Sequence, residues 1–367
     1  MIQADVWRSF PTILYQFMQR ACGRLSSQSR FSTLSHLIMP TEIDPAIIRA
    51  LKSSDIDASN AKISTHGGSG FASTLRITTP ETSVFVKIGS SKGSATMFEG
   101  EYASLNAIHD AVPNLAPKAF AWGRLEQQSG AYFLATEFLD MSGAGLRSAS
   151  KSGSGMSLAA KLARLHTAPI PPDFQGKGFG FPVSTCCGET IQNNTWKPSW
   201  AKFFAENRLM HILECAEKNN GKDTSLRQLI EDICSKVVPK LLGEGHLGGK
   251  DGVGPRIVHG DLWSGNKESA SFTGRQNGGV EEVVFDPSVA YCHHEFDHGI
   301  MNMFGGFGGS FWKEYFEQCP KTEPAQEYED RVQLYEAYHH LNHYAIFGGT
   351  YKSGASKLLQ PLLKKHG

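Results

Sequence analysis

The sequence lacks the features that most directly mark a membrane protein or a nucleic-acid-binding protein. Its 367 residues contain no run of about eighteen or more apolar residues, the length that a membrane-spanning helix needs. The 36 basic residues are balanced by 36 acidic ones, so no net positive charge is available to attract nucleic acid or an anionic membrane. We therefore expect neither nucleic acid nor a membrane among its partners.

The cysteine pattern gives no sign of a disulfide framework or of a cysteine-based zinc site. The seven cysteines are an odd number, and no two of them form a Cys-x-x-Cys pair. Such usage is typical of a reducing compartment, so we expect a cytoplasmic location. The seven are Cys22, Cys186, Cys187, Cys215, Cys234, Cys292 and Cys319.

Residues 1–38 differ in composition from the rest of the chain. They contain four arginines but a single acidic residue, Asp5, and they end in a serine-rich stretch. A segment poor in acids and rich in Arg and Ser is typical of a mitochondrial transit peptide, although Pro11 interrupts its helical pattern. We expect either a disordered extension or such a peptide, with mitochondrial location as the alternative to cytoplasm.

Strand patterns cluster before residue 140, and helical patterns dominate after it. This order predicts a two-lobed α+β fold with a cleft between the lobes. We expect a nucleotide-binding lobe over 39–140 and a catalytic and substrate lobe over 141–367. The predicted helices cover 41–51, 96–109, 158–166, 199–218, 224–242 and 328–344, the predicted strands cover 84–88 and 132–139, and a hairpin lies between 266 and 286.

One polar motif carries most of the chemical information. The segment Val258–Asn266 (VHGDLWSGN) follows an apolar, strand-like run, and Asp286 ends a second such run twenty residues later. Kinase-like phosphotransferases use an Asp, an Asn and an Asp in this order to orient the attacking hydroxyl and to hold Mg²⁺. The motif predicts Asp261 as the catalytic base and Asn266 and Asp286 as metal ligands. The alternative for Asp261 is an ordinary turn residue.

A glycine-rich turn and a strand lysine lie upstream of this motif. Glycines at residues 67–70 allow backbone N–H groups to approach a phosphate, although a plain hairpin turn has the same sequence signal. Lys87 ends an apolar strand, where it either snorkels to water or joins the phosphates to a helix carboxylate, Glu101. The residues predicted to bind nucleotide here are Gly67, Gly68, Ser69, Gly70, Lys87 and Glu101.

A second polar cluster follows Asp286. His293 and His294 are adjacent, but no set of ligands at the spacing of a zinc site completes them. We expect the cluster to brace the metal loop, with Asp297 behind the metal ligands, and we also count His293 and Asp297 among the candidates for the substrate side. His259 is expected to anchor the catalytic loop by hydrogen bonds.

Five segments together resemble one family of kinases. They are MFEGEYASL at 97–105, GFGFPVSTCCG at 178–188, the run at 200–209, HGDLWSGN at 259–266 and MFGGF at 303–307. In these segments the chain, from about residue 39 onward, resembles the fructosamine-3-kinase (ketosamine-3-kinase, protein-ribulosamine kinase) family, a branch of the protein-kinase-like enzymes.

The resemblance implies a bilobal protein-kinase-like fold with a small N-terminal antiparallel β-sheet lobe and a larger, mainly helical C-terminal lobe. It implies ATP and Mg²⁺ as cofactors. It makes Glu137, Phe138 and Leu139 an interlobe hinge whose backbone meets the adenine, and Trp263 a wall for the sugar. It also implies a monomer or a weak homodimer. Relatives with a cysteine in the glycine-rich loop can form an intermolecular disulfide, but this loop has none.

The substrate implied by the resemblance is a ketoamine sugar on a protein lysine or a small amine. Phosphorylation of its 3-hydroxyl leads to breakdown of the adduct and release of the amine. One alternative is a small-molecule kinase for an aminoglycoside or choline-like acceptor, against which the LWSGN and TCCG elements argue. Another is a pseudokinase binding module, which the presence of Lys87, Asp261, Asn266 and Asp286 disfavours.

Overall fold

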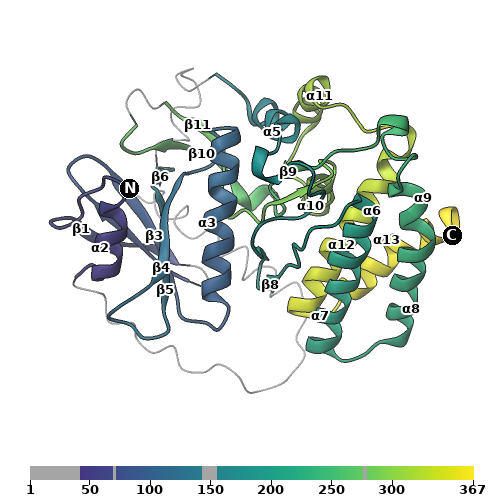
Figure 1. Cartoon of the computed structure of the whole chain (residues 1–367), viewed down its shortest axis with the longest axis horizontal. Coiled ribbons are helices and arrows are strands. Elements are labelled where there is room, and N and C mark those ends of the chain that lie inside the picture. Colours follow the sequence, from purple (N-terminus) through teal and green to yellow (C-terminus); the bar gives the residue numbers. More distant parts are fainter. Residues whose placement is uncertain (1–41, 69–71, 143–154, 276–278) are drawn as a thin grey trace, which may run out of the picture.

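The computed structural model describes residues 42–68, 72–142, 155–275 and 279–367. The predicted two-lobed α+β fold is confirmed: Figure 1 shows a β-sheet lobe on the left and a mainly helical lobe on the right, with helix α3 (Ser94–Ala111) between them. The predictions for residues 1–38, for Ser69 and Gly70, and for most of the loop after Met141 fall outside the described residues. The predicted lobe boundary near residue 140 remains a prediction.

The smaller lobe is built on a five-stranded antiparallel sheet with the strand order β1-β2-β3-β5-β4. Its strands have alternating or nearly continuous apolar residues, which bury one face against helix α2 (Pro45–Lys52). Asp44 caps α2 by accepting a hydrogen bond from Ala46 N at 2.9 Å. The strands are β1 (Lys62–Gly68), β2 (Ser73–Thr78), β3 (Ser83–Gly89), β4 (Ala119–Arg124) and β5 (Tyr132–Glu137).

Helix α3 joins the two lobes through packing. Phe98, Leu105 and Ile108 are buried in the same hydrophobic cluster as the helices of the larger lobe. At Gly100 the helix approaches the backbone of Ser184 so closely that a Cβ atom would lie 2.5 Å from its carbonyl oxygen. Glycine is therefore required here, because any side chain would collide with the backbone at Ser184.

A small sheet connects the lobes at the hinge. Strand β6 (Leu139–Asp140) pairs with β10 (Lys267–Phe272), which pairs with β11 (Glu281–Val284) in the predicted hairpin. The hairpin also contacts the smaller lobe, because Thr82 Oγ1 donates to Thr273 O at 3.2 Å. The predicted strand at 132–139 is thus divided: β5 ends at Glu137, and the chain then pairs with the hairpin.

The larger lobe consists of helices packed around a buried aromatic core. The predicted helices are confirmed, including α5 (Leu158–Thr167), whose cap Ser157 accepts from Ala160 N at 3.1 Å. The helix at 200–220 and the one at 224–242 each contain a π-helical segment that the sequence pattern did not indicate. The remaining helices are α6 (Trp200–Lys202), α7 (His211–Asn220), α8 (Thr224–Asp232), α9 (Val238–Leu242), α10 (Phe296–Phe304), α11 (Gly309–Gln318), α12 (Tyr328–Phe347) and α13 (Tyr351–His366), with π-helical segments at Phe203–Met210 and Ile233–Val237.

Short strands in the larger lobe position the chemical residues. Strand β9 (Arg256–Val258) leads into the catalytic motif and pairs with β12 (Ala290–Cys292). A separate two-stranded ribbon is formed by β7 (Cys186–Cys187) and β8 (Thr190–Ile191).

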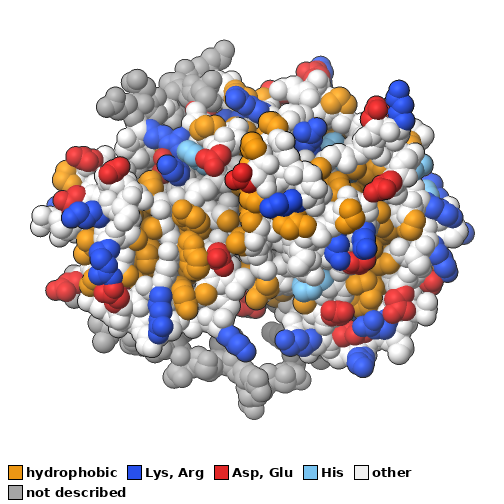
Figure 2. Space-filling view, viewed as in Figure 1, with side chains coloured by type: hydrophobic (Ala, Val, Ile, Leu, Met, Phe, Trp, Pro, Cys, Tyr) orange, Lys and Arg blue, Asp and Glu red, His pale blue; other side chains and the backbone are white. Residues whose placement is uncertain are grey.

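Figure 2 shows positive and negative side chains interspersed over the face that it presents. Within the described ranges, no helix has the length and apolar character that crossing a membrane would require.

Candidate active site

Lys87 lies between two carboxylates that are far apart in the sequence. Its Nζ atom is 2.6 Å from Glu101 Oε1 and 2.5 Å from Asp286 Oδ1. The lysine comes from β3, the glutamate from α3 and the aspartate from the loop after β11. One ammonium group thus links the smaller lobe to the predicted metal loop of the larger lobe. The pairing with Glu101 is the one expected from the kinase pattern.

The three charged groups shift one another's protonation. Burial alone would lower the pKa of Lys87, but the negative charges of Asp286 and Glu101 outweigh it and raise this pKa above its ordinary value. Burial raises the pKa of Glu101, and the Lys87 ammonium opposes that shift only in part. The lysine is therefore held in its charged form, which the predicted role as a phosphate anchor requires.

Asp286 adopts an unusual backbone conformation. Its φ is +55°, in the left-handed region that few residues other than glycine occupy, although Asp tolerates it better than most. Its side chain is 52% exposed, so the carboxylate contacts Lys87 and is still open to solvent. Strain of this kind persists where the surrounding structure holds it, and it often marks a functional residue.

Backbone hydrogen bonds bring Asn266 and Asp286 together. Asn266 directly precedes β10, and Asp286 lies two residues after β11, so the antiparallel hairpin returns the chain to its starting point. Phe285 N donates to Asn266 O at 3.1 Å, and Phe285 O accepts from His259 Nε2 at 3.1 Å. His259 therefore ties the catalytic loop to the metal loop, as predicted. Burial lowers its pKa, which keeps the ring neutral with Nε2 protonated.

The catalytic loop turns sharply at Gly260. This residue has a φ of +82°, and a Cβ atom would lie 2.0 Å from Ser288 O, so only glycine fits. The turn places the half-buried Asp261 beside Asn266, whose Nδ2 atom donates to Asp261 O at 2.8 Å. The proposed base and the proposed metal ligand are thus in direct contact.

Asp261 is a more basic carboxylate than an ordinary aspartate. Burial raises its pKa to about 8, and the nearby charges of Asp286 and Asp297 add to this effect. Hydrogen bonds from the thiol of Cys187 and from the Asn266 side chain act in the opposite direction. A raised pKa improves a carboxylate as a proton acceptor.

Cys187 is a contact that the sequence analysis missed. Its thiol is buried, hydrogen-bonds to the Asp261 carboxylate, and has a pKa raised well above its ordinary value, so it stays protonated. Asn342 Nδ2 lies 3.3 Å from Cys187 Sγ and donates to Cys187 O at 3.2 Å. The TCCG segment was recognised as a motif, but nothing in its pattern indicates a contact with Asp261, 74 residues away in the sequence.

Asn266 and Asp286 fit a magnesium ion. Asn266 turns its amide nitrogen toward Asp261, which leaves its amide oxygen directed elsewhere. The carboxylate of Asp286 is half exposed beside it. One amide oxygen and one carboxylate are the hard oxygen donors that Mg²⁺ takes, with waters and phosphates completing its shell. The donor set is thus suitable for the ion that the motif implies.

Asp297 supports the catalytic loop from behind. Its side chain is fully buried; Oδ2 accepts from His259 N and Oδ1 accepts from Gly260 N, both at 2.7 Å. His166 Nε2 donates to Oδ2 at 3.0 Å. Burial opposes ionisation, but these donors outweigh it and lower the pKa of Asp297. The expected bracing role fits this geometry, whereas the assignment of Asp297 to the substrate side is wrong, because no surface of the residue is open.

Replacing Asp297 by asparagine is expected to lower kcat by about 10- to 100-fold, the usual effect of removing a support behind a ligand. An amide has a single acceptor atom, so it cannot accept from both backbone N–H groups, and the loop that carries Asp261 loses its fixed position. Steady-state kinetics should show the loss in kcat, with the KM for ATP changed less. The exposed Asp173 provides a matched control, Asp173→Asn. Equal kinetics for both variants would contradict the bracing role.

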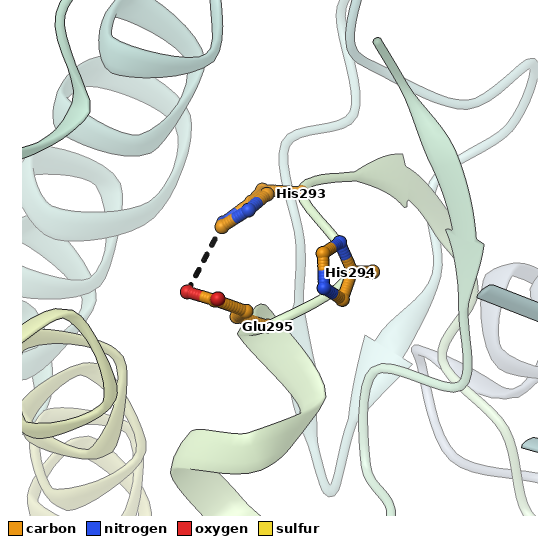
Figure 3. A group of neighbouring side chains, drawn as sticks. All are labelled: His293, His294 and Glu295. Atoms are coloured by element: carbon orange, nitrogen blue, oxygen red, sulfur yellow. Dashed lines mark ion pairs between the residues drawn. The ribbon is translucent and has the colours of Figure 1, made fainter. Parts of the chain in front are cut away.

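His293, His294 and Glu295 form a cluster that resembles a metal site (Figure 3), although two of its members are held by other residues. Their ligand atoms lie within 4.8 Å of one another. However, Glu295 pairs with the buried guanidinium of Arg331, with Nε at 2.7 Å from Oε2. His293 is hydrogen-bonded through Nδ1 to Tyr335 Oη and through Nε2 to Thr322 Oγ1. The ligand atoms of His293 and Glu295 are therefore already used, and a cation there would meet a guanidinium; His294 Nε2, a buried atom without a hydrogen-bond partner in the described part of the chain, would be a single ligand.

The substrate assignment of His293 is also wrong. The residue is 1% exposed, and burial lowers its pKa well below the ordinary value, so it is a neutral core histidine. The expectation that this cluster is structural agrees with its contacts.

The predicted hinge is only partly open to a nucleotide. The Glu137 carboxylate is held by Arg275, with Nε at 2.7 Å from Oε1, and Glu137 N donates to Lys118 O. The carbonyl oxygen of Phe138 accepts from Thr273 N at 3.2 Å. These groups are committed to the fold, and Leu139 itself pairs with Phe272 in the small sheet of β6 and β10, so the adenine contact at the hinge remains a prediction. Gly67 and Gly68 lie in β1 rather than in a loop.

Trp263 lies at the open side of the catalytic loop. It is half-buried, and its ring packs over Gly265, where a Cβ atom would lie 2.3 Å from the indole. The glycine therefore lets the ring fold back over its own loop, next to Asp261 in the sequence. This position agrees with the expected sugar wall, which remains a prediction.

The fold and the cluster of Lys87, Glu101, Asp261, Asn266 and Asp286 define a kinase-like phosphotransferase. Comparison with known sequences is more specific: a sequence profile described as fructosamine kinase matches residues 43–365. The chain belongs to the fructosamine kinase family.

Named relatives are similar over most of their length. A chloroplastic protein-ribulosamine 3-kinase from Arabidopsis thaliana is 35% identical over 303 residues, which cover 83% of each chain. A ketosamine-3-kinase from Mus musculus is 31% identical, with 84% of this chain and 98% of the relative covered.

Solved structures confirm the fold. A protein from Haemophilus somnus 129PT, assigned as a fructosamine-3-kinase, superposes with a TM-score of 0.65 at 25% identity, covering 86% of this chain and 96% of that one. The aminoglycoside phosphotransferase APH(4)-Ia has a TM-score of 0.50 at 11% identity, covering 87% and 99% of the two chains. The second likeness shows the kinase-like fold alone.

Proposed function

We propose that the protein is a Mg²⁺- and ATP-dependent ketosamine 3-kinase. Its substrates are ribulosamine or fructosamine adducts on protein lysines or on free amines, and phosphorylation leads to loss of the sugar and recovery of the amine. The observation that carries the proposal is the contact between the proposed base Asp261 and the proposed metal ligand Asn266, with Lys87 bound to Asp286 beside them. The names of the relatives supply the substrate class.

The residues suggest a direct transfer. The 3-hydroxyl oxygen of the ketoamine attacks the γ-phosphorus of ATP, the bond to the β-phosphate oxygen breaks, and ADP leaves. Asp261 orients the hydroxyl and takes its proton. Lys87 holds the phosphates, and Glu101 holds Lys87. A Mg²⁺ ion at Asn266 and Asp286 would neutralise phosphate charge.

The test is a phosphotransfer assay with ribulosamine, psicosamine and fructosamine derivatives of lysine, in parallel with hygromycin B. We expect ATP consumption with at least one ketoamine, formation of the 3-phosphate, and loss of turnover when EDTA removes Mg²⁺, restored by added Mg²⁺. Turnover on hygromycin B alone would favour the aminoglycoside alternative. Nucleotide binding without transfer to any acceptor would favour the pseudokinase alternative.

The location in the cell is a separate part of the proposal. The cysteine usage favours the cytoplasm, and the composition of residues 1–38 favours a mitochondrial transit peptide as the alternative. Fluorescent fusions of the chain from Met1 and from Met39 distinguish the two. Mitochondrial signal for the first fusion and cytoplasmic signal for the second would establish the transit peptide.

A further inference from the structure

A polar segment of the larger lobe packs against the catalytic loop. It runs over residues 185–194, includes strands β7 and β8, and begins with the TCCG element, which has no part in the phosphotransfer described above. Figure 1 shows β8 between helices α3 and α12; β7 contacts α3, and β8 contacts α12. This stretch, here called the TCCG segment, thus lies between the helix that carries Glu101 and the helices of the larger lobe.

Buried hydrogen bonds fasten the TCCG segment on two sides. Gln192 Oε1 accepts from Thr185 Oγ1 at 3.0 Å and from Ser288 Oγ at 2.7 Å, and Gln192 Nε2 donates to Tyr338 Oη on α12 at 2.7 Å. Ser288 N in turn donates to His259 O at 2.8 Å. All of these side chains are buried, and such buried networks hold one geometry when their members are satisfied. The segment is therefore fixed to α12 and to the backbone of the catalytic loop.

The TCCG segment presents the thiol of Cys187 to the catalytic base. This thiol hydrogen-bonds to the Asp261 carboxylate, and burial raises its pKa well above the ordinary value, so it keeps its proton. Asn342 Nδ2, from α12, donates to Cys187 O at 3.2 Å and to Cys187 Sγ at 3.3 Å. A thiol sulfur both accepts and donates weakly. Because Asn342 supplies the hydrogen on its side of the sulfur, the thiol hydrogen is left for Asp261.

We propose that Cys187 is a positioning residue for Asp261. Its thiol holds the carboxylate at an angle that leaves an oxygen for the hydroxyl of the acceptor, and Asn342 acts through Cys187 by fixing the sulfur. This inference rests on the kinase function proposed above and adds a residue to its machinery. A small misplacement of a group at the reacting atoms lowers the rate strongly, so a donor that fixes the carboxylate increases kcat.

Cys187 differs from the other donor to this carboxylate. The Asn266 side chain also hydrogen-bonds to Asp261, but its amide is a proposed metal ligand. The position of Asn266 therefore depends on the ion. Cys187 is 1% exposed and is held by Asn342 and by the TCCG segment, so it keeps the carboxylate in one place before and after the metal binds.

The experiment compares Cys187→Ala with Cys187→Ser, two variants of nearly equal size that differ by one hydroxyl donor. With a ribulosamine acceptor, Cys187→Ala should lower kcat by about tenfold or more, the scale of one hydrogen bond to a charged group. The KM for ATP should stay nearly unchanged, because Lys87 and the proposed metal ligands are intact. Cys187→Ser can still donate and should recover most of kcat, whereas a purely structural role predicts the same loss for both variants.

A second buried cysteine provides the matched control. Cys292 is 0% exposed, and its thiol hydrogen-bonds to Arg208. Cys292→Ala therefore removes a buried thiol from the same lobe without removing a donor to Asp261, and it should leave kcat unchanged. An equal loss of kcat in Cys292→Ala and Cys187→Ala would show that any cavity in this part of the lobe slows the reaction, and it would overturn the proposal.

Asn342→Leu tests the step behind Cys187. The Oδ1 atom of Asn342 has no hydrogen-bond partner within the described ranges, so leucine removes only the donor. We expect kcat to fall by about two- to tenfold, the scale of a neutral hydrogen bond. In the Cys187→Ala background the same change should cost much less, because Asn342 acts through the sulfur. If Cys187→Ala fails to fold, the loss of kcat in Asn342→Leu at an unchanged KM for ATP decides.

The outcomes distinguish this proposal from the one on which it rests, because the same base serves any acceptor. A wild-type protein that phosphorylates hygromycin B but no ketoamine defeats the ketosamine assignment, and the comparison of the Cys187 variants is then made with hygromycin B. A wild-type protein that phosphorylates neither defeats both proposals. A folded Cys187→Ala variant with wild-type kcat, or a Cys187→Ser variant with the same loss as Cys187→Ala, overturns the role of Cys187 and leaves the kinase function intact.

Discussion

Asp261→Asn is expected to lower kcat by about 10²- to 10⁴-fold, the range for loss of a positioned general base. Asparagine has nearly the same shape and keeps an oxygen for the attacking hydroxyl, but it cannot take the proton. The backbone oxygen of residue 261 still accepts from Asn266, so the loop should keep its structure. Initial-rate kinetics with a ribulosamine acceptor should show the loss in kcat, with the KM for ATP nearly unchanged.

The same substitution should stabilise the ligand-free protein. The pKa of Asp261 is about 8 in the folded state, well above the value of an unfolded aspartate. The folded state therefore binds this proton more tightly, and the associated stability is present at low pH and is lost as the pH rises through 8. Asparagine carries no charge and avoids the cost of ionising this side chain in the folded state. The variant should therefore be more stable than wild type at pH 7 to 8 by about 1–2 kcal/mol, a figure that already allows for solvent screening of the half-buried residue.

Thermal unfolding without Mg²⁺ or nucleotide, from pH 4 to pH 8, measures this difference. The Tm values of the two proteins should converge toward pH 4, where the carboxyl is protonated in both states. Asp251→Asn, at an exposed position, is the control and should change neither kcat nor Tm. A variant with wild-type kcat would contradict the role of Asp261 as base, and a Tm difference that is the same at every pH would contradict its raised pKa.

Local signals made much of this fold predictable. The cap at Asp44 and the apolar spacing along α3 and α5 are properties of short segments, and the structure reproduces them. The proximity of Asp261, Asn266 and Asp286 was predictable from their order in the sequence. A hairpin separates the last two, and an antiparallel hairpin brings the chain back to the point where it began. The pair of Lys87 and Glu101 was predictable for a similar reason, because the lysine lies on a strand and the glutamate on the helix that directly follows it in the chain.

Contacts across the sequence were not predictable in the same way. Cys187 reaches Asp261, and Arg275 holds Glu137, only because separate segments fold together. The two misassigned substrate residues show the same limit: sequence places His293 and Asp297 near the metal loop but does not reveal on which side of it they lie. The buried partners decide that question: Tyr335 bonds to His293 and His166 bonds to Asp297, and both partners come from distant helices.

Lys87→Met is expected to lower kcat/KM for ATP by about 10²- to 10³-fold. Removing one partner of a buried charge pair costs about 3–5 kcal/mol at most, and the loss is smaller here because the Lys87 side chain is 17% exposed. Without the ammonium group, Glu101 and Asp286 face the phosphates as uncompensated negative charges. Burial then raises the pKa of Glu101 further, since the positive charge of Lys87 that opposes this shift is lost. The defect should appear mainly as a higher KM for ATP, together with a lower kcat.

Lys87→Arg should restore little of the activity, because a guanidinium is wider than an ammonium group and cannot occupy the 2.5–2.6 Å contacts to both carboxylates. Lys62→Met, at an exposed position in β1 of the same sheet, is the matched control and should behave as wild type. Isothermal titration with a non-hydrolysable ATP analogue separates binding from transfer. Wild-type affinity in Lys87→Met would show that the ion pairs serve the structure of the lobe interface, because a lysine that holds phosphates cannot be removed without weakening nucleotide binding.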